Sequence, residues 1–268
     1  MATTRVVRGL ALACHPGPTL AVTVLTALLA WSAGHLPGRG LLVTGAVLTG
    51  QLSIGWSNDL VDAGRDRAVG RTDKPLASGD VPERVVRLAC GTALVACVGL
   101  SLACGLASGL VHLALGVASG WSYNLWFKRS VLSPLPYAVA FGALPAVVTL
   151  ALPTPALPPA WVVATGAFLG VGAHLLNALP DLADDEATGV RALPHVLGAG
   201  VVRRLAPAVL LAGTVVAAYG PGIDPAGWLL LGVCGALAVV AVLTRGRVPF
   251  VAAILIALAN VVALVARS

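Results

Sequence analysis

Long apolar runs alternate with short polar connections along the whole chain. Nine runs of about 20 residues cover 17–36, 40–57, 86–106, 108–127, 134–152, 160–179, 204–220, 226–243 and 248–266. Runs of this length match the roughly 30 Å hydrocarbon core of a bilayer. Only helices satisfy their own backbone hydrogen bonds in lipid. The pattern therefore predicts an all-α, polytopic membrane protein with nine transmembrane helices, forming one domain over residues 1–268.

Composition and the placement of charge support this prediction. The chain is 58% hydrophobic and 10% charged, with a mean hydropathy of +0.92, whereas soluble domains carry roughly 25% charged residues. Of the 17 Lys and Arg residues, 15 fall on one side of the predicted spans. The positive-inside rule places this side in the cytoplasm, together with the N-terminus, and the C-terminus opposite. The net charge of +6 is then explained by topology and anionic lipid headgroups, so the cell membrane, and no nucleic acid, is the predicted partner.

A polar motif interrupts the apolar pattern twice. Six residues recur 119 positions apart, and each copy reads Asn-x3-Asp-x3-Asp-x3-Gly-x4-Pro-x3-Gly. The first copy occupies residues 58–79 and the second residues 177–198. Ten of the 11 acidic residues lie in or beside the two copies: Asp59, Asp62, Asp66, Asp73, Asp80, Glu83, Asp181, Asp184, Asp185 and Glu186. This concentration of carboxylates in an apolar chain predicts that the two copies hold a cation.

Each copy lies at the end of a predicted span. If the helix continues, Asn58, Asp62 and Asp66 form one stripe on its surface, because residues four apart share a helix face. The equivalent stripe of the second copy comprises Asn177, Asp181 and Asp185. Neighbouring carboxylates repel each other near a bilayer, and charges there are functional by default. Hard oxygen ligands shared with a phosphate predict Mg²⁺. Solvated helix caps are the alternative, which two copies with identical spacing disfavour.

Basic side chains accompany the acidic stripes. Arg67, Arg71 and Lys74 follow the first stripe, Arg191 follows the second, and Lys128 and Arg129 end the fourth predicted span on the same side. Carboxylates that hold a metal, beside cations that hold oxygen anions, are typical of a diphosphate site. Because the site lies among membrane helices, the other end of the ligand is predicted to be a long hydrocarbon. The predicted substrate is a polyprenyl diphosphate.

These motifs resemble those of the UbiA superfamily of intramembrane prenyltransferases, of the 4-hydroxybenzoate polyprenyltransferase type. Residues 58–79 (NDLVDAGRDRAVGRTDKPLASG) and 177–198 (NALPDLADDEATGVRALPHVLG) are similar to its two signatures. Residues 123–136 (YNLWFKRSVLSPLP) resemble its Tyr and Lys-Arg element, and residues 15–30 resemble the start of its first span. Lys74 stands where the family usually has arginine. The resemblance implies a nine-helix bundle with a central polar cavity that opens to the cytoplasmic side.

The resemblance also implies roles for individual residues. Two Mg²⁺ ions, bridged by the diphosphate, would be bound by Asn58, Asp62, Asp66, Asn177, Asp181 and Asp185. The catalytic set would be Asp62, Asp66, Asp181, Asp185 and Lys128. The diphosphate oxygens would be held by Arg71, Lys74, Lys128 and Arg191, with Tyr123 or Asn124. In the family, the tyrosine often lies four residues before the lysine, and in this chain Asn124 occupies that position before Lys128. Which of Tyr123 and Asn124 faces the site is therefore left open.

Several polar residues near the motifs receive weaker assignments. Asp59 and Asp184 lie off the stripes, so ligation of the metal by either is the less favoured interpretation. His174 lies one turn before Asn177 on the same helix face, which makes it a speculative acceptor-binding residue beside a structural interpretation. The other histidines, including His15, are interpreted as structural.

Three functions are compatible with the sequence. The favoured one is Mg²⁺-dependent transfer of a polyprenyl group to a hydrophobic, aromatic acceptor, as in quinone-type lipid biosynthesis. A terpene cyclase of the same family would carry the same motifs, because the cation then attacks its own chain. A non-enzymatic transporter or lipid-binding scaffold is the third, since transporters also use repeated halves around polar sites.

Overall fold

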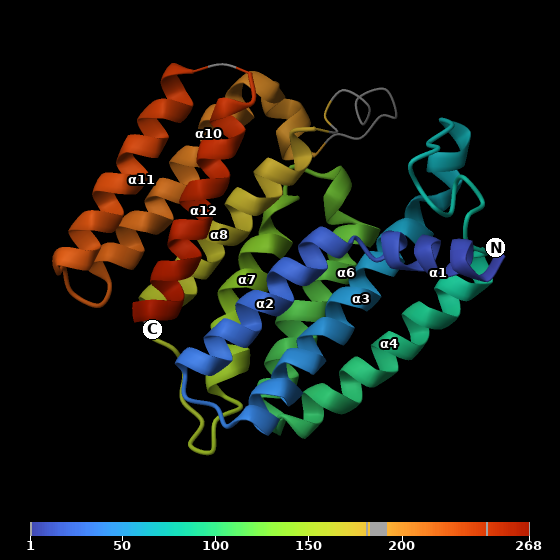
Figure 1. Cartoon of the computed structure of the whole chain (residues 1–268), viewed down its shortest axis with the longest axis horizontal. Helices are drawn as coiled ribbons and strands as arrows, with labels where there is room; N and C mark the ends of the chain where they lie inside the picture. Colours follow the sequence, from blue (N-terminus) through green and yellow to red (C-terminus); the bar gives the residue numbers. More distant parts are fainter. Residues whose placement is uncertain (1, 181, 183–191, 245, 268) are drawn as a thin grey trace. The chain divides into compact units, whose positions relative to one another are not determined.

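A computed structural model describes the chain except residues 1, 181, 183–191, 245 and 268. Its regular secondary structure in the described residues is entirely helical, which confirms the predicted all-α class. The chain forms two compact units, residues 1–125 and 126–268. Figure 1 shows the helices of both units.

The first unit is built around one long helix. Its elements are α1 (Ala2–Ala13), α2 (Pro16–Ser32), α3 (Pro37–Ala68), α4 (Glu83–Ala103), α5 (Leu106–Val111), a π-helical turn (His112–Val117) and α6 (Ala118–Leu125). Helix α3 packs against α2, α4 and α6. Its 32 residues extend about 48 Å at 1.5 Å per residue, which is longer than the hydrocarbon core. Helix α3 is therefore longer than the length needed to span a bilayer, and the first motif begins on its C-terminal part.

The second unit is a bundle of long helices. Its elements are a 3₁₀ turn (Phe127–Arg129), α7 (Pro134–Thr149), α8 (Ala160–Ala178), α10 (Leu193–Tyr219), α11 (Pro225–Leu243) and α12 (Val248–Arg267). Helix α8 packs against α7, α10 and α12, and α10 also packs against α11. Close approach of α7 and α8 requires glycine, because a Cβ atom at Gly170 would overlap the Tyr137 carbonyl oxygen.

The predicted apolar runs all fall on helical segments of the described chain, but they differ in length and continuity. Among the described residues, five helices (α4, α8, α10, α11 and α12) are long and apolar enough to cross a membrane, or six if α1 and α2 form one span bent by 61°. Helix α7 has only 16 residues, and the predicted run 108–127 is interrupted by the π-helical turn. The predicted number of nine spans thus remains a prediction.

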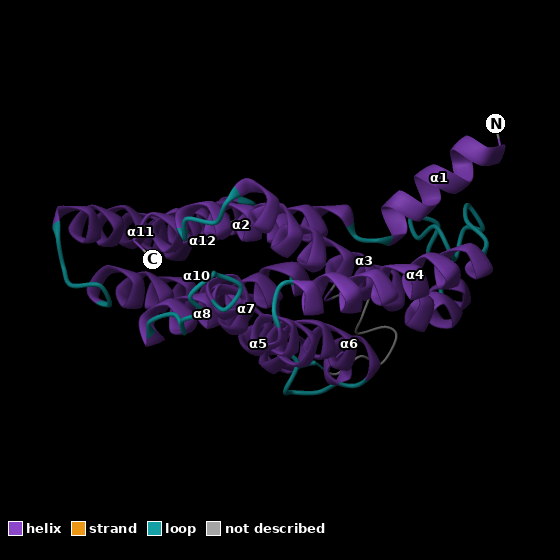
Figure 2. Ribbon diagram, turned by 90° about the horizontal axis from the view of Figure 1, so that it is seen from below, coloured by secondary structure: helices purple, strands orange, loops and turns teal. Residues whose placement is uncertain are grey.

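An apolar cluster holds α1 against the loop that follows α3. Ala13 of α1 and Ala63 of α3 are buried with Leu76 and Val81 of the loop 69–82. In Figure 2, α1 leaves the neighbouring helices at an angle. The indole Nε1 of Trp56 donates a 2.9 Å hydrogen bond to the Leu10 carbonyl oxygen. These contacts anchor both α1 and the loop on the end of α3.

Candidate active site at the end of helix α3

The sequence around Gly70 determines where α3 ends. Gly70 has a φ of +71°, which is favourable only for residues without a Cβ atom. The Gly70 amide donates to the Arg67 carbonyl, and the Arg71 amide donates to the Asp66 carbonyl at 2.9 Å. This is the hydrogen-bond pattern of a Schellman motif. This motif ends the helix directly after the acidic stripe. It also turns the chain back, so that Arg71 lies near Asp66 in space.

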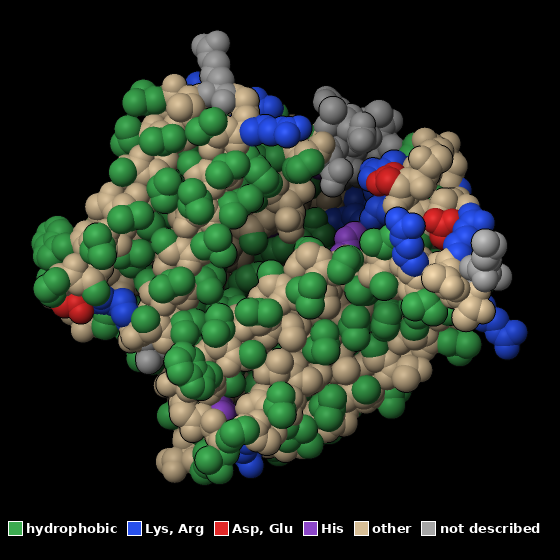
Figure 3. Space-filling model, in the orientation of Figure 1, with side chains coloured by type: hydrophobic (Ala, Val, Ile, Leu, Met, Phe, Trp, Pro, Cys, Tyr) green, Lys and Arg blue, Asp and Glu red, His purple; other side chains and the backbone are tan. Residues whose placement is uncertain are grey.

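Two carboxylates of the predicted stripe are buried on α3. Asp62 and Asp66 are each only 4% exposed, one helical turn apart. Arg65 lies beside both: its Nη2 is 3.6 Å from Asp62 Oδ2, and its Nε is 3.9 Å from Asp66 Oδ1. Arg71 and Lys74 of the following loop also lie within electrostatic range of Asp66. Charged side chains gather at this end of the first unit, whereas the rest of its visible face is mostly apolar (Figure 3).

Asn58, the first residue of the stripe, is held by α6. Its Nδ2 donates to the side-chain oxygen of Asn124 at 3.1 Å. Asn124 is buried and donates in turn to Ser57 Oγ at 2.8 Å and to the Ile54 carbonyl at 2.9 Å. Asn124 therefore uses its whole amide to position α3 and Asn58. Tyr123 beside it is half-buried.

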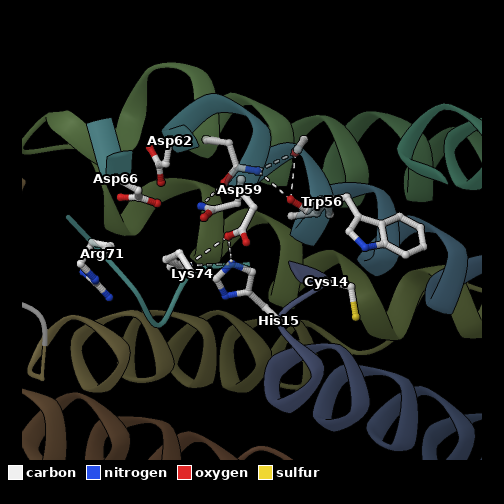
Figure 4. A network of polar contacts seen from close by, with 12 residues as sticks. Cys14, His15, Trp56, Asp59, Asp62, Asp66, Arg71 and Lys74 are labelled. Atoms are coloured by element: carbon white, nitrogen blue, oxygen red, sulfur yellow. Dashed lines mark hydrogen bonds and ion pairs between the residues drawn. The ribbon is translucent and has the colours of Figure 1, made fainter. Parts of the chain in front are cut away.

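Lys74 contacts a carboxylate outside the stripe. Its Nζ lies 3.0 Å from Oδ1 of Asp59. The same oxygen is 2.8 Å from His15 Nε2. Asp59 is only 2% exposed. In Figure 4, its carboxylate is turned toward His15 and Lys74, whereas the carboxylates of Asp62 and Asp66 lie next to each other farther along the helix.

Arg71 is oriented by a neighbour in its own loop. Its Nε and Nη2 each donate to one oxygen of Asp73 at 2.8 Å. This bidentate hydrogen bond lowers the pKa of the Asp73 carboxyl to about 2. Asp73 thus remains ionised over the physiological range, and the planar guanidinium of Arg71 is held at the edge of the site.

The donor set of the first copy fits Mg²⁺ in its chemistry. Asn58, Asp62 and Asp66 offer amide and carboxylate oxygens, which are the ligands that this hard cation prefers. Among the residues that the structure describes, no three His, Cys, Asp or Glu side chains converge as a metal site. A Mg²⁺ ion at the first copy would therefore need further ligands from a substrate, from water or from other residues.

Part of the second copy lies outside the described residues. This applies to three predicted site residues, Asp181, Asp185 and Arg191. Asn177 is exposed and lies one residue before the end of α8. The closing glycines of the two copies, Gly79 and Gly198, have the same φ of +76°. At this position, the two copies share a positive φ, and Gly198 forms a kink inside α10.

His174 lies within a hydrogen-bonded group of the second unit. It is 2% exposed, and its Nε2 is 3.0 Å from the hydroxyl of buried Ser133. The same hydroxyl accepts the Leu193 amide at 3.3 Å, at the start of α10. The Tyr137 ring lies 4.9 Å from the His174 ring between centroids. These contacts describe a tie between α8 and α10, and binding of an acceptor by His174 remains a prediction. Lys128 is half-buried in the 3₁₀ turn before α7.

The structure adds two residues that sequence reasoning did not assign to the site. His15 stands between α1 and α2 with a φ of +55°, unusual for a residue with a Cβ atom. Its position before Pro16 was the only signal in the sequence. Arg65, between the two aspartates, was counted only as a topology signal, although its spacing of three residues from Asp62 places both on one helix face.

Comparisons with known proteins agree on one family. The description "UbiA prenyltransferase family" belongs to the family model that matches residues 20–258. The bacteriochlorophyll synthase 33 kDa chain of Cereibacter sphaeroides is 33% identical over 194 residues, which are 67% of this chain and 63% of that protein. The match thus spans less than two thirds of that relative.

Solved structures resemble the whole chain. The apo structure of a UbiA homologue from Aeropyrum pernix K1 has a TM-score of 0.73 at 17% identity, covering 93% of this chain and 98% of that one. A UbiA homologue from Archaeoglobus fulgidus bound to GPP and Mg²⁺ has a TM-score of 0.69 at 15% identity and covers 99% of each chain. At these identities, the likeness establishes the fold.

Proposed function

Because the chain belongs to the UbiA prenyltransferase family, we propose that it transfers a polyprenyl group from a prenyl diphosphate to an acceptor within the membrane, with Mg²⁺ as cofactor. The observation that carries this proposal is the buried pair Asp62 and Asp66, flanked by Arg71 and Lys74. Buried carboxylates need a cation to compensate their charge, and the basic loop supplies groups for anionic oxygens. The GPP and Mg²⁺ in the Archaeoglobus fulgidus homologue are the ligands that such a site would take.

Each residue of the proposed site has a role that follows from its chemistry. Asn58, Asp62 and Asp66 would hold one side of the metal-bound diphosphate, and Asn177, Asp181 and Asp185 the other. Bound Mg²⁺ would neutralise the charge of the departing diphosphate. The diphosphate oxygens would be held by the basic side chains of Arg71, Lys74, Lys128 and Arg191. Side chains fixed by neighbours, such as Asn58 and Arg71, lose little freedom when they bind.

The reaction exchanges one bond to the first prenyl carbon for another. The bond from this carbon to the diphosphate oxygen breaks, and its electron pair leaves with the diphosphate. The electron-rich acceptor then forms a bond to the same carbon and loses a proton. Electrostatic groups that stand ready where charge develops lower the barrier, because they need no reorganisation during the reaction.

The acceptor is the finer part of the proposal. We favour a hydrophobic, aromatic acceptor, as in quinone-type lipid synthesis. The name of the Cereibacter sphaeroides relative supports a second candidate, a bacteriochlorophyll-type pigment precursor. Purified protein in lipid vesicles, given labelled geranyl diphosphate and Mg²⁺, should form a labelled adduct with one acceptor class and little product without acceptor. A cyclic hydrocarbon formed without acceptor would instead identify a terpene cyclase.

Substitution of the acidic stripes tests whether the protein is an enzyme. Asp62→Ala and Asp181→Ala should each lower turnover by about a hundredfold or more, because each would remove a charged ligand from the site. Asp80→Asn is the matched control, since Asp80 pairs with Arg5 on the exposed surface. Full activity in both alanine variants would reject the acidic stripes as the catalytic site, whereas a wild-type protein that turns over no prenyl diphosphate with any acceptor would favour a transporter or scaffold.

A further inference from the structure

Three side chains from three segments meet at one carboxylate oxygen of the first unit. Oδ1 of Asp59 lies 2.8 Å from His15 Nε2 and 3.0 Å from Lys74 Nζ, and these two nitrogens are 3.4 Å apart. His15 lies between α1 and α2, Asp59 on α3 and Lys74 in the loop after α3. A carboxylate 2% exposed is thus paired with the Lys74 ammonium and hydrogen-bonded to His15, as buried charges require.

The partners of Asp59 separate it from the acidic stripe. It lies seven residues before Asp66, about 10 Å along α3 at 1.5 Å per residue, and its carboxylate contacts side chains of two other segments. Figure 4 shows its carboxylate directed at His15 and Lys74. In this arrangement the Asp59 carboxylate orients His15 and Lys74, and both of them contact its Oδ1 atom.

The internal repeat gives an independent argument. The six recurring residues include every member of the metal stripe, but position 59 corresponds to Ala178 and position 74 to Leu193. Both partners of the Asp59–Lys74 pair are therefore absent from the second copy together. A metal ligand at position 59 would not require a lysine at position 74, so there would be no reason for the second copy to lack both residues. A pair that acts as a unit explains both differences.

The backbone around His15 is arranged to hold the imidazole at Asp59. His15 has a left-handed conformation, which costs free energy in a residue with a Cβ atom. The preceding carbonyl of Cys14 lies so close to α3 that a Cβ atom at Gly55 would overlap it. The hydroxyl of Thr19 donates to this carbonyl at 2.9 Å. The junction between α1 and α2 is consequently pinned to α3 beside Asp59.

We propose that Asp59 is a positioning residue that fixes the ammonium group of Lys74 for the diphosphate, with His15 as the second side chain that shares the carboxylate. Asp59 is not a metal ligand in this arrangement. The inference rests on the proposed function, because it assigns Lys74 to the diphosphate. A lysine carries a compact charge on a flexible side chain, whereas the guanidinium of an arginine can bind a partner in a bidentate manner. The position of the Lys74 ammonium therefore depends strongly on a partner such as Asp59.

The first experiment separates positioning from metal binding. Asp59→Asn should raise the KM for geranyl diphosphate about tenfold or more, since a misplaced group of this kind weakens substrate binding strongly. The Mg²⁺ concentration for half-maximal activity should stay within about twofold of wild type, while Asp62→Asn raises it. A rise in the Mg²⁺ requirement of Asp59→Asn, with KM unchanged at saturating Mg²⁺, would make Asp59 a metal ligand and overturn the proposal.

A double-mutant cycle keeps the test valid if Asp59→Asn folds poorly, because one unpaired buried charge is costly whereas removal of both is tolerated. Asp59→Asn, Lys74→Met and the double variant are compared in activity and in Tm. The double variant should be no less active than Lys74→Met and should melt above Asp59→Asn. Effects on KM that simply multiply would show that Asp59 does not act through Lys74.

The Tm cycle also distinguishes two kinds of failure. Coupling of Asp59 and Lys74 in Tm, in a protein that turns over no prenyl diphosphate with any acceptor, would leave the ion pair standing but reject the proposed function, and with it the positioning role. Activity in wild type without coupling in Tm or KM would reject the positioning role alone. Asp80→Asn serves as control on the same loop, because it removes only an exposed ion pair with Arg5.

Discussion

The two copies of the repeated motif each have a histidine nearby, and the partners of the two histidines differ in kind. In the first copy, His15 shares the Asp59 carboxylate with the side chain of Lys74. In the second, His174 contacts the Ser133 hydroxyl, which accepts the backbone amide of Leu193. Lys74 and Leu193 are equivalent positions of the repeat, each directly before its proline.

This difference shows how one backbone pattern can serve two purposes. The residue before the proline is held by its charged side chain in the first copy and by its backbone in the second. A charged side chain can act on a ligand, whereas a backbone tie can only fix where α10 begins. We infer that the position before the proline has different tasks in the two copies, phosphate contact at Lys74 and helix attachment at Leu193.

The largest expected effect of this comparison comes from introducing methionine separately at the two equivalent positions, 74 and 193. Lys74→Met should lower kcat/KM for geranyl diphosphate about a hundredfold, because it removes a charge from the proposed phosphate contact. Leu193→Met should change it less than about threefold, since leucine and methionine have similar volumes and the Ser133 contact uses the backbone. Steady-state kinetics at saturating Mg²⁺ measure both. Equal losses in the two variants would remove the distinction between the copies.

The closing glycines provide the next test. Gly79→Ala and Gly198→Ala each place a Cβ atom at a φ of +76°, which should cost about 1–2 kcal/mol of stability per site. Thermal unfolding in detergent compares them with Gly91→Ala on α4, where a Cβ atom meets open space and alanine is the better helix former. Only Gly79→Ala should also raise KM for geranyl diphosphate, because Gly79 ends the turn that carries Lys74. A Gly198→Ala variant as stable as wild type would show that the positive φ of Gly198 is not needed for the fold.

A smaller effect is expected from the tie of the second unit. Ser133→Ala removes the group that joins His174 to the Leu193 amide, which should cost about 1–2 kcal/mol because a buried donor loses its partner. The KM for geranyl diphosphate should change little if the tie is purely structural. Parallel measurement of Tm and KM decides this. A large change in KM with a small change in Tm would return His174 or Ser133 to the substrate site.

The smallest effect concerns the exposed pair of Arg71 and Asp73. Because the folded-state pKa of Asp73 is lowered to about 2, its contribution to stability is complete above the unfolded value near 4 and is lost as the pH falls toward about 2. An exposed pair contributes at most about 1 kcal/mol. The Tm difference between wild type and Asp73→Asn should therefore be small and constant from about pH 8 to pH 5. A difference that varies within this range would mean that another group titrates with the pair.

Local signals in the sequence were enough for most helices. Apolar runs located the helical segments after residue 16, and the spacing of Asp62 and Asp66 placed both carboxylates on one face of α3. Helix α1 was not predicted, because it precedes the first apolar run. The family was also recognisable from these motifs, which the match over residues 20–258 confirms.

Only the tertiary structure decided which partners the polar side chains take. His15 and Asp59 are 44 positions apart, Asn58 and Asn124 are 66 apart, and Ser133 and His174 are 41 apart. Helical periodicity relates residues within a few turns and says nothing about contacts between helices. Such contacts depend on how closely two backbones approach, as at Gly55 and Cys14. Composition and spacing therefore located the acidic stripe, whereas packing assigned Asp59 to Lys74 and Asn124 to Asn58.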